Sequence, residues 1–300
     1  MRVSNFLHIW WLLIAVASVA ADGPVDRAYR QEIRKWRADY EDNLKRDNGW
    51  LTLAGLYWLK EDDNRFGTGP GNDLILPQGS APEAAGSFVF QDGKTRLRLN
   101  AGVQALLNGA PVLTDMELKP DAAGKPDRIT LGHLSMIVIQ RGRRYGIRLW
   151  DNQSAVRRDF KGTRWFPAKE SYRVVAKFVS YPQPKTIPIL NVLGDTEQNP
   201  SPGYAEFELD GKPCRLEPLL EGDHLFFIFK DATSGKQTYP AGRFLYTGTP
   251  KDGRLILDFN HAENPPCAFT AYATCPLPPR QNHLQVAIEA GELNHEHPAK

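Results

Sequence analysis

The segment Phe88-Val89-Phe90-Gln91-Asp92-Gly93-Lys94-Thr95-Arg96-Leu97-Arg98-Leu99 shows most directly what kind of fold the chain adopts. Asp92-Gly93 is a dipeptide that favours tight turns, and it separates two short β-like runs, so the segment predicts an antiparallel hairpin. Turn dipeptides of this kind recur nearby, at Pro70-Gly71, Asn108-Gly109 and Arg141-Gly142.

Short β-like runs continue along the chain on both sides of this hairpin. The first series covers residues 74–76, 87–90, 97–99, 129–131, 135–140 and 146–150, and the second covers residues 172–178, 204–209, 225–229, 243–246 and 255–259. No segment of useful length has a helical period after residue 50. We therefore predict a mostly β, antiparallel body. Its predicted parts are a first β region over residues 60–150 and a second β domain over residues 151–293. Pro182, Pro184 and Pro188 indicate a long loop or a sheet edge in the second.

One helix is predicted before the β region. Val25, Tyr29, Ile33, Trp36, Tyr40 and Leu44 are spaced so that they share one face of a helix, and Asp47-Asn48-Gly49 would end it. The charges on the other faces are mixed, which favours a helix docked on a larger core over a membrane-surface helix. Residues 22–59 are thus the N-terminal helix and its connector.

The ends of the chain have a different character. Residues 1–21 combine Arg2, an apolar run over residues 6–19 and small residues at the end, which predicts a cleaved signal peptide. The alternative is a retained anchor or a buried helix, although the run is short for a membrane span. After cleavage we expect no membrane span and a periplasmic or secreted protein. Residues 294–300 are expected to form a flexible tail.

Composition excludes several classes of protein. The chain has 300 residues with a formal net charge of +2, a hydrophobic share of 41% and a charged share of 24%. These values are those of a globular chain, and so small a net charge gives no electrostatic case for a nucleic-acid partner. No phosphate-binding loop, dinucleotide fingerprint or nucleophile elbow occurs, so we expect no cofactor.

The first β region resembles a forkhead-associated (FHA) domain. Residues 64–76 contain the opening Gly67, a variable loop, Asn72-Asp73 and an apolar strand, and Asn108-Gly109 and residues 129–132 resemble later landmarks of that family. The resemblance implies a β-sandwich over roughly residues 60–150. Two phosphate-binding features are missing, because Thr68 replaces an expected Arg and Glu83 lies where a Ser-x-x-His should follow. We therefore expect no phosphothreonine peptide to bind.

Almost all of the chain after the leader resembles the bacterial domain-of-unknown-function 1684 family. The segments that carry the resemblance are residues 47–56, 144–151, 258–260, 264–269 and 275–279. The resemblance implies membership of an uncharacterised family, and it brings no activity and no catalytic residue to this chain.

The three cysteines suggest a disulfide in an oxidising compartment. Cys267 and Cys275 bracket a short loop, and a bond between them would close it. The alternatives are free buried thiols or a metal or redox role, although no Cys-x-x-Cys spacing supports the latter. Cys214 is expected to be a buried free thiol.

Histidine and arginine residues give weaker signals. His261 and His283 both follow an asparagine and could face one pocket, but no third zinc ligand is evident, so no metal site is predicted. The basic run of Arg141, Arg143, Arg144 and Arg148 lies on a predicted hairpin. It is expected to be mostly a solvated face, with an anion site as the alternative.

The strongest polar constellation lies late in the chain. Asp258 and Asn260 are two residues apart and so would share one face of a strand, with Phe259 pointing into the core. Arg243 is predicted to be the cross-strand partner of Asp258. The pair could be a structural ion pair, or part of a polar pocket under residues 264–279. The candidate binding residues are Asp231, Tyr239, Arg243, Asp258, Asn260, His261 and Asn264.

Two functions compete on this evidence. The first is an exported, noncatalytic binding or envelope-interaction module, whose partner is a small molecule or an envelope protein. The second is a hydrolase-like enzyme that uses Asp258, Asn260, His261 or Asp231 in a site of the C-terminal domain. A concave site with convergent polar groups and a perturbed carboxylate would favour the enzyme.

Overall fold

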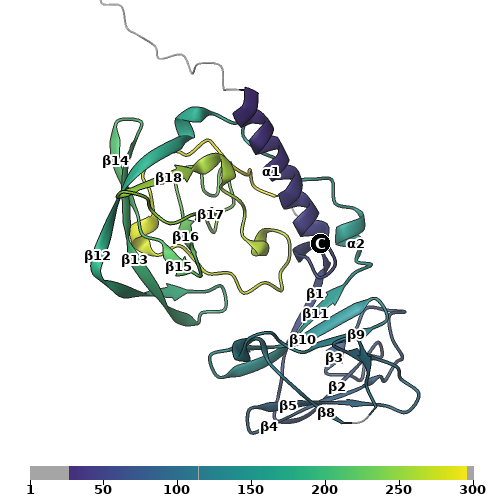
Figure 1. Cartoon of the computed structure of the whole chain (residues 1–300). Coiled ribbons are helices and arrows are strands. Elements are labelled where there is room, and N and C mark those ends of the chain that lie inside the picture. Colours follow the sequence, from purple (N-terminus) through teal and green to yellow (C-terminus); the bar gives the residue numbers. More distant parts are fainter. Residues whose placement is uncertain (1–26, 114, 296–300) are drawn as a thin grey trace, which may run out of the picture.

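The computed structural model describes residues 27–113 and 115–295, which form two β-rich parts and one long helix (Figure 1). The predicted signal peptide over residues 1–21 and the last residues of the predicted tail, 296–300, lie outside the described residues. The predicted fold class, mostly β with an N-terminal helix, is confirmed.

The helix α1 (Arg27–Lys45) buries the face that the sequence spacing predicts. Tyr29, Ile33 and Leu44 are buried, and the charged residues lie on the other faces. Asn48 has a φ of +60°, so the chain leaves the helix in the left-handed conformation that asparagine and glycine tolerate best. The one-turn 3₁₀ helix η1 (Trp50–Thr52) then leads into the first strand.

A two-sheet β-sandwich follows, drawn in dark blue to teal at the bottom of Figure 1. One sheet has the order β1-β11-β10-β9-β6-β7, formed by β1 (Leu53–Trp58), β11 (Arg144–Asp151), β10 (Leu134–Arg141), β9 (Arg128–Leu131), β6 (Leu106–Leu107) and β7 (Ala110–Pro111). The other has the order β3-β2-β4-β5-β8, formed by β3 (Leu74–Ile75), β2 (Asp62–Gly67), β4 (Gly86–Gln91), β5 (Lys94–Leu99) and β8 (Met116–Leu118).

The two sheets of the sandwich enclose one apolar core. Phe66 and Phe88 from one sheet are fully buried with Met136 and Ile147 from the other. The predicted hairpin is confirmed, because Gln91 pairs with Lys94 across the turn. The 3₁₀ helix η2 (Asp121–Ala123) lies in the connection between β8 and β9.

The C-terminal part contains two further antiparallel sheets. One has the order β14-β13-β12-β18, formed by β14 (Lys212–Leu216), β13 (Thr196–Leu209), β12 (Arg173–Leu190) and β18 (Arg254–Asp258). The other has the order β15-β16-β17, formed by β15 (Leu219–Glu221), β16 (His224–Phe229) and β17 (Arg243–Thr247). The short helices α2 (Ala155–Arg158) and η3 (Glu170–Tyr172) precede these sheets. Phe207, Phe227, Phe229 and Phe259 are among the side chains that fill the core of this part.

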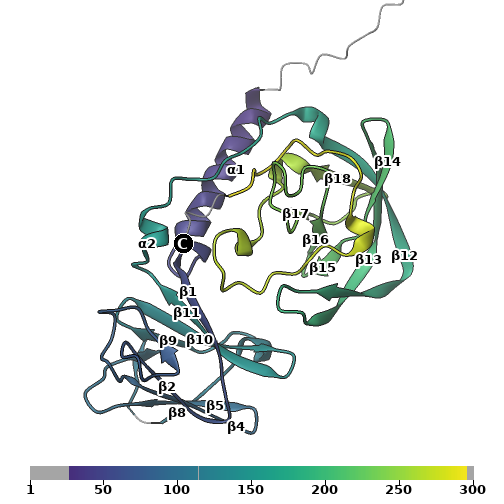
Figure 2. The same cartoon turned by 180° about the vertical axis from the view of Figure 1, so that it is seen from behind.

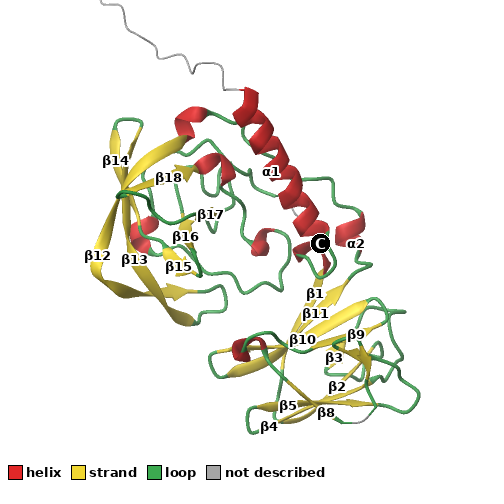
Figure 3. Ribbon diagram, viewed as in Figure 1, coloured by secondary structure: helices red, strands yellow, loops and turns green. Residues whose placement is uncertain are grey.

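Residues 259–295 run mainly as loop along the inner side of this part, shown yellow in Figure 1 and mostly as loop in Figure 3. Their helical turns are η4 (Phe259–His261), η5 (Pro266–Ala268) and η6 (Arg280–Asn282). Seen from both sides, α1 lies between this segment and the connection through α2 (Figures 1 and 2). None of the helices within the described residues has the length and apolar character needed to cross a membrane.

The proline-rich segment lies in a strand, so the alternative of a long loop is wrong. Pro182 and Pro184 fall in an irregularity of the β12–β13 pairing between Ser180 and Lys185. β18 pairs only with residues 173–177 of β12. At Pro188 the edge of β12 that faces β18 is therefore unpaired. A missing N–H is tolerated at an edge or a bulge because no ladder hydrogen bond is lost there.

Candidate functional site

A cleft of about 570 Å³ lies where α1, the sandwich and the C-terminal part meet. Its residues come from the helix and the turn after it, from the outer face of the β9–β10–β11 sheet, and from one position beyond η4. They are Trp36, Asp39, Tyr40, Asn43, Leu44, Arg46, Asn48, Gly49, Trp50, Arg128, Ile137, Arg148, Trp150 and Glu263. The cleft therefore combines aromatic rings, cations and two carboxyl groups, Asp39 and Glu263, from three parts of the chain.

Two arginines on the sheet wall belong to one cross-strand row. Ile137 on β10 pairs with Arg148 on β11 and with Arg128 on β9, so the order across the sheet is Arg128–Ile137–Arg148. Cross-strand partners point to the same face, which explains why all three side chains line the cleft.

Each guanidinium of the row lies against a tryptophan. The Arg148 guanidinium carbon is 6.0 Å from the Trp50 ring centroid, and that of Arg128 is 5.1 Å from the Trp150 ring centroid. Such placement over a ring face is an attractive cation–π interaction, and it holds a charged group at an apolar wall without neutralising it.

Arg148 is the more deeply buried cation. Arg148 is only 8% exposed, and desolvation of its guanidinium lowers its pKa to about 10. It forms no ion pair with any residue of 27–113 or 115–295, its Nε has no hydrogen-bond partner there, and one Nη donates to Thr274 Oγ1 at a long 3.4 Å. Arg128 donates to Ser135 Oγ at 2.9 Å, and burial lowers its pKa too.

A pair of carboxyl groups lies on the opposite side of the cleft. Glu263 lines it, and Glu292 is fully buried behind Tyr40. The Tyr40 hydroxyl and the Asn264 N–H donate to Glu292 Oε2 at 3.1 and 2.7 Å. Desolvation is the main cause that raises the pKa of each carboxyl to about 8, and the charge of Glu292 adds to the shift at Glu263. Both groups therefore hold a proton near neutral pH.

The backbone before Glu292 explains how this carboxyl reaches its buried position. Gly291 has a φ of +80°, and a Cβ there would lie 2.5 Å from the carbonyl oxygen of Ala262. Only glycine permits this close approach, which lets the Glu292 N–H bond to Ala262 O at 2.8 Å. Glu292 Oε1 and Asn264 Oδ1 are buried and have no hydrogen-bond partner among the described residues.

The predicted pairing of Arg243 with Asp258 is wrong. Strand β17 pairs with β16 and places Arg243 opposite Phe229, whereas β18 pairs with β12 and places Asp258 opposite Arg173. Arg243 is fully buried and donates to Asp231 Oδ2 at 2.8 Å, to Ile288 O at 3.0 Å and to Ala290 O. Asp231 is thus the structural partner of Arg243, and neither residue lines the cleft.

Asp258 and Asn260 join α1 to the C-terminal part. The Tyr29 hydroxyl donates to both Asp258 oxygens at 2.8 and 2.7 Å and accepts from Asn260 Nδ2 at 3.0 Å. The two residues do not share a strand face, because β18 ends at Asp258 and Asn260 lies in η4. They nevertheless meet, since Asp258 caps η4 by accepting the Asn260 N–H at 3.1 Å. Phe259 is buried in the core as predicted.

The remaining candidates pack around α1. His261 lies edge-on to Trp36 with ring centroids 4.6 Å apart, and burial lowers its pKa. Tyr239 packs against the cluster of Leu44, Leu51, Ala268 and Phe269, of which Leu44 lines the cleft. Within the described ranges no group of three or more His, Cys, Asp or Glu side chains is arranged to hold a metal ion.

The cysteines behave as predicted. Cys267 and Cys275 form a disulfide, and Cys214 is a buried free thiol. The closed loop touches the sandwich, because Thr270 Oγ1 donates to Leu53 O at 3.1 Å and Thr274 accepts from Arg148. The disulfide thus lies in a loop that forms part of the contact between the two β parts.

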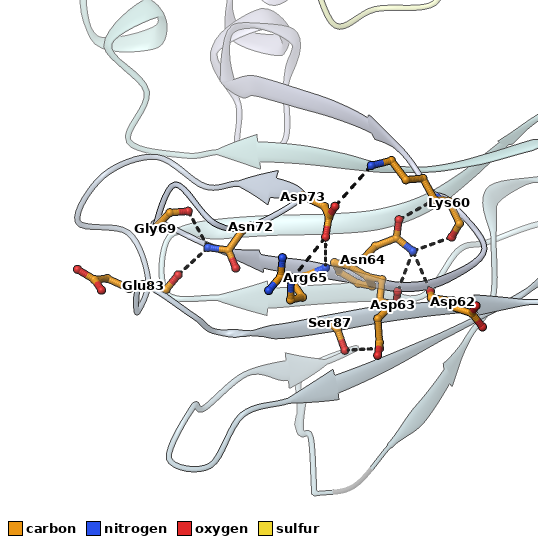
Figure 4. A network of polar contacts seen from close by, with 11 residues as sticks. Lys60, Asp62, Asp63, Asn64, Arg65, Gly69, Asn72, Asp73, Glu83 and Ser87 are labelled. Atoms are coloured by element: carbon orange, nitrogen blue, oxygen red, sulfur yellow. Dashed lines mark hydrogen bonds and ion pairs between the residues drawn. The ribbon is translucent and has the colours of Figure 1, made fainter.

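The region that would carry an FHA phosphate site uses its polar groups internally (Figure 4). Asn72 Nδ2 donates to the carbonyls of Gly69 and Glu83, each at 2.7 Å, and Asp73 accepts from the Arg65 N–H at 3.0 Å. Thr68 is 5% exposed and its hydroxyl donates to Ala81 O at 3.3 Å. This loop is ordered by its own hydrogen bonds.

The comparisons with known proteins identify a family. Residues 158–293 match the family described as "Protein of unknown function (DUF1684)", and the chain belongs to this family through that part. No curated protein matches the chain.

Three solved structures are similar to parts of the chain. An uncharacterized protein from Haloarcula marismortui is 34% identical over 46% of this chain and 78% of its own, with a TM-score of 0.39. The FhaA FHA domain, solved with the intracellular domain of Rv3910, is 21% identical over 31% of this chain and 96% of its own, with a TM-score of 0.23. An FHA domain from a study of phosphothreonine-dependent interactions is 21% identical over 32% of this chain and 92% of its own, with a TM-score of 0.23. FHA domains thus occur among the matches, and no ligand is transferred from them.

Proposed function

We propose that this DUF1684 protein is an exported, noncatalytic binding protein that takes a small anionic molecule into the cleft between α1, the sandwich and the C-terminal part. The proposal keeps the small-molecule partner that the sequence suggested and replaces its predicted site. Asp231, Arg243, Asp258 and Asn260 have structural partners, whereas Arg148 on the sheet wall of the cleft has no carboxylate partner among the described residues.

The proposal depends mainly on one observation: Arg148 is buried and has no carboxylate partner among the described residues. A buried charge costs several kcal/mol unless an opposite charge or hydrogen bonds compensate for it. Arg141 and Arg144, from the same basic run, are paired with Asp121 and Asp195, but Arg148 has no carboxylate partner within the described residues. An anionic ligand in the cleft would supply that compensation.

The aromatic side chains of the cleft support a small ligand over a protein partner. Trp36, Tyr40, Trp50 and Trp150 line a concave volume of about 570 Å³, which suits a small molecule. A neutral Glu263 carboxyl at the cleft wall can donate a hydrogen bond to an anion and does not repel it.

Export is the part of the proposal that rests on the sequence and on the disulfide. Residues 1–21 have the pattern of a signal peptide, and the Cys267–Cys275 bond suits an oxidising compartment. N-terminal sequencing of protein secreted from a bacterial host should find a start near Ala21 or Asp22. A mature protein that still begins at Met1 would contradict export.

The binding test uses isothermal titration calorimetry with octanoate, benzoate and inorganic phosphate. We expect at least one of these anions to bind, and Arg148→Gln to weaken it by about 10- to 100-fold, because a charge-assisted hydrogen bond contributes about 1.5–3 kcal/mol. Arg143→Gln is the matched control, since Arg143 is an exposed residue on the turn after β10 and does not line the cleft. If none of the three anions binds, or if both variants bind equally well, the proposal is overturned.

A second candidate function is supported by Glu263. Its carboxyl lines the cleft and holds a proton near neutral pH, so it can act as a general acid. A carboxyl with such a raised pKa is the feature that the sequence analysis required for an enzyme. In that case Glu263→Gln would abolish turnover of a bound ester while leaving anion binding intact. Binding without turnover in the unmodified protein favours the first proposal.

A further inference from the structure

We infer that the ligand of the cleft carries two anionic groups joined by an apolar spacer. The inference rests on the proposed function and concerns the chemical class of the ligand. It is drawn from the row Arg128–Ile137–Arg148, which presents a cation, an apolar side chain and a second cation to the same cleft.

The register fixes how far apart the two cationic positions are. Arg128 and Arg148 are each direct partners of Ile137, so their backbones are two strand spacings apart, about 10 Å. The guanidiniums also end on different groups, Arg128 on Trp150 and Ser135 and Arg148 on Trp50 and Thr274. A single carboxylate is therefore not expected to contact both. Two anionic groups at the ends of one molecule can compensate for both.

The middle of the row requires the spacer to be apolar. Ile137 is 5% exposed and packs with Trp150, Leu53 and Ile139, so the surface between the guanidiniums offers few polar partners. A polar group placed there would lose its water without a replacement hydrogen bond. A hydrocarbon chain would instead bury its apolar surface against Ile137, which favours binding.

The tryptophans keep the two cations at the ends of this surface. Trp50 lies under Arg148 and Trp150 under Arg128, so each guanidinium has its own aromatic support. Of the other charged groups in the cleft, Arg46 adds positive charge, and Asp39 is paired with Lys35. Glu263 holds a proton near neutral pH and adds no negative charge.

The experiment compares three probes in calorimetric titrations of the full chain at about pH 6.5, where carboxylates of ordinary pKa are ionised. Suberate has two carboxylates and a long apolar spacer, octanoate has the same chain with one carboxylate, and succinate has two carboxylates close together. We expect suberate to bind about tenfold or more tightly than either of the others, since only suberate satisfies both guanidiniums and the apolar middle.

Variants then assign each end of the ligand. Arg128→Gln should reduce suberate affinity to that of octanoate and leave octanoate binding nearly unchanged, because octanoate needs only the more deeply buried Arg148. Arg148→Gln should weaken both probes, and Arg143→Gln should weaken neither. Far-UV circular dichroism and thermal melting of each variant show whether it is folded before the titrations are compared.

The outcomes separate this inference from the proposed function. If suberate and octanoate bind equally well and Arg148→Gln weakens both, the inference of a ligand with two anionic groups is wrong. The proposal that the cleft binds an anion would still hold. Equal binding of suberate and succinate would overturn the apolar spacer. Failure of all three probes, together with benzoate and phosphate, would overturn the anion cleft itself.

Discussion

Replacing Asp231 with asparagine tests the buried ion pair that Asp231 forms with Arg243. Arg243 and Asp231 have no side-chain exposure, and the Arg243 guanidinium donates to Asp231 Oδ2 at 2.8 Å. Asp231→Asn keeps the size of the side chain, removes the negative charge, and can place an amide donor against the guanidinium. Arg243 would then be a buried, uncompensated cation.

The expected cost follows from this burial. Breaking a buried pair by removing one partner costs about 3–5 kcal/mol, which corresponds to a fall in Tm of about 6–20 °C for a chain of this size. Asp39→Asn is the control, because its partner Lys35 is 78% exposed and Asp39 itself 57% exposed. An exposed pair of this kind contributes less than about 1 kcal/mol.

The assay is equilibrium unfolding in urea with the disulfide intact, followed by circular dichroism and by tryptophan fluorescence. Both probes are needed because two β-rich parts can unfold in separate steps. If the free energies of unfolding of Asp231→Asn and of the Asp39→Asn control differ by less than about 1 kcal/mol, the buried pair is not a major source of stability. The reasoning from its burial would then be wrong.

Four further outcomes are expected. The folded Glu263 and Glu292 carboxyls hold protons up to a pKa of about 8, whereas unfolded ones release them near 4.5. The free energy of unfolding should therefore fall as pH rises from about 5 to about 8, by up to about 1.4 kcal/mol per pH unit for each proton, and the slope should be smaller in Glu292→Gln. Tyr29→Phe should cost about 1–3 kcal/mol in urea unfolding, because it leaves Asp258 without its hydroxyl donor. Alkylation of unreduced, denatured protein should label one thiol by mass spectrometry, and labelling of three would exclude the disulfide. Phosphothreonine peptides should show no binding to the protein in fluorescence anisotropy; micromolar binding that phosphatase removes would show that residues 60–150 retain a phosphate site.

Local patterns predicted the elements of this fold well. The hairpin at Asp92-Gly93 and the buried face of α1 depend on neighbours only a few residues away, and both are found as expected. The partner of Arg243 could not be obtained in this way. Two strands that are adjacent in sequence pair with different neighbours in the sheets, so Arg243 and Asp258 have other partners.

The cleft was only partly visible in the sequence. Arg148 belongs to a basic run for which an anion site was one alternative. The sequence could not show that, among the described residues, Arg141 and Arg144 form ion pairs while Arg148 does not, because their partners Asp121 and Asp195 are brought to them by the fold. Tyr40 was recognised only as part of the apolar face of α1. Glu292 was missed because it lies next to the predicted tail, and only the fold shows that its carboxyl is buried.

The bond between Tyr29 and Asp258 also has a consequence for the order of events during synthesis. Residues 29 and 258 are separated by 229 positions, so the helix leaves the ribosome long before the segment that covers it. Until residues 258–292 are made, α1 lacks part of its docking site, although Trp36 and Tyr40 can already pack against Trp165. Contacts over such sequence distances form slowly. We therefore expect chains that stop before residue 258 to expose part of this helix to proteases and chaperones.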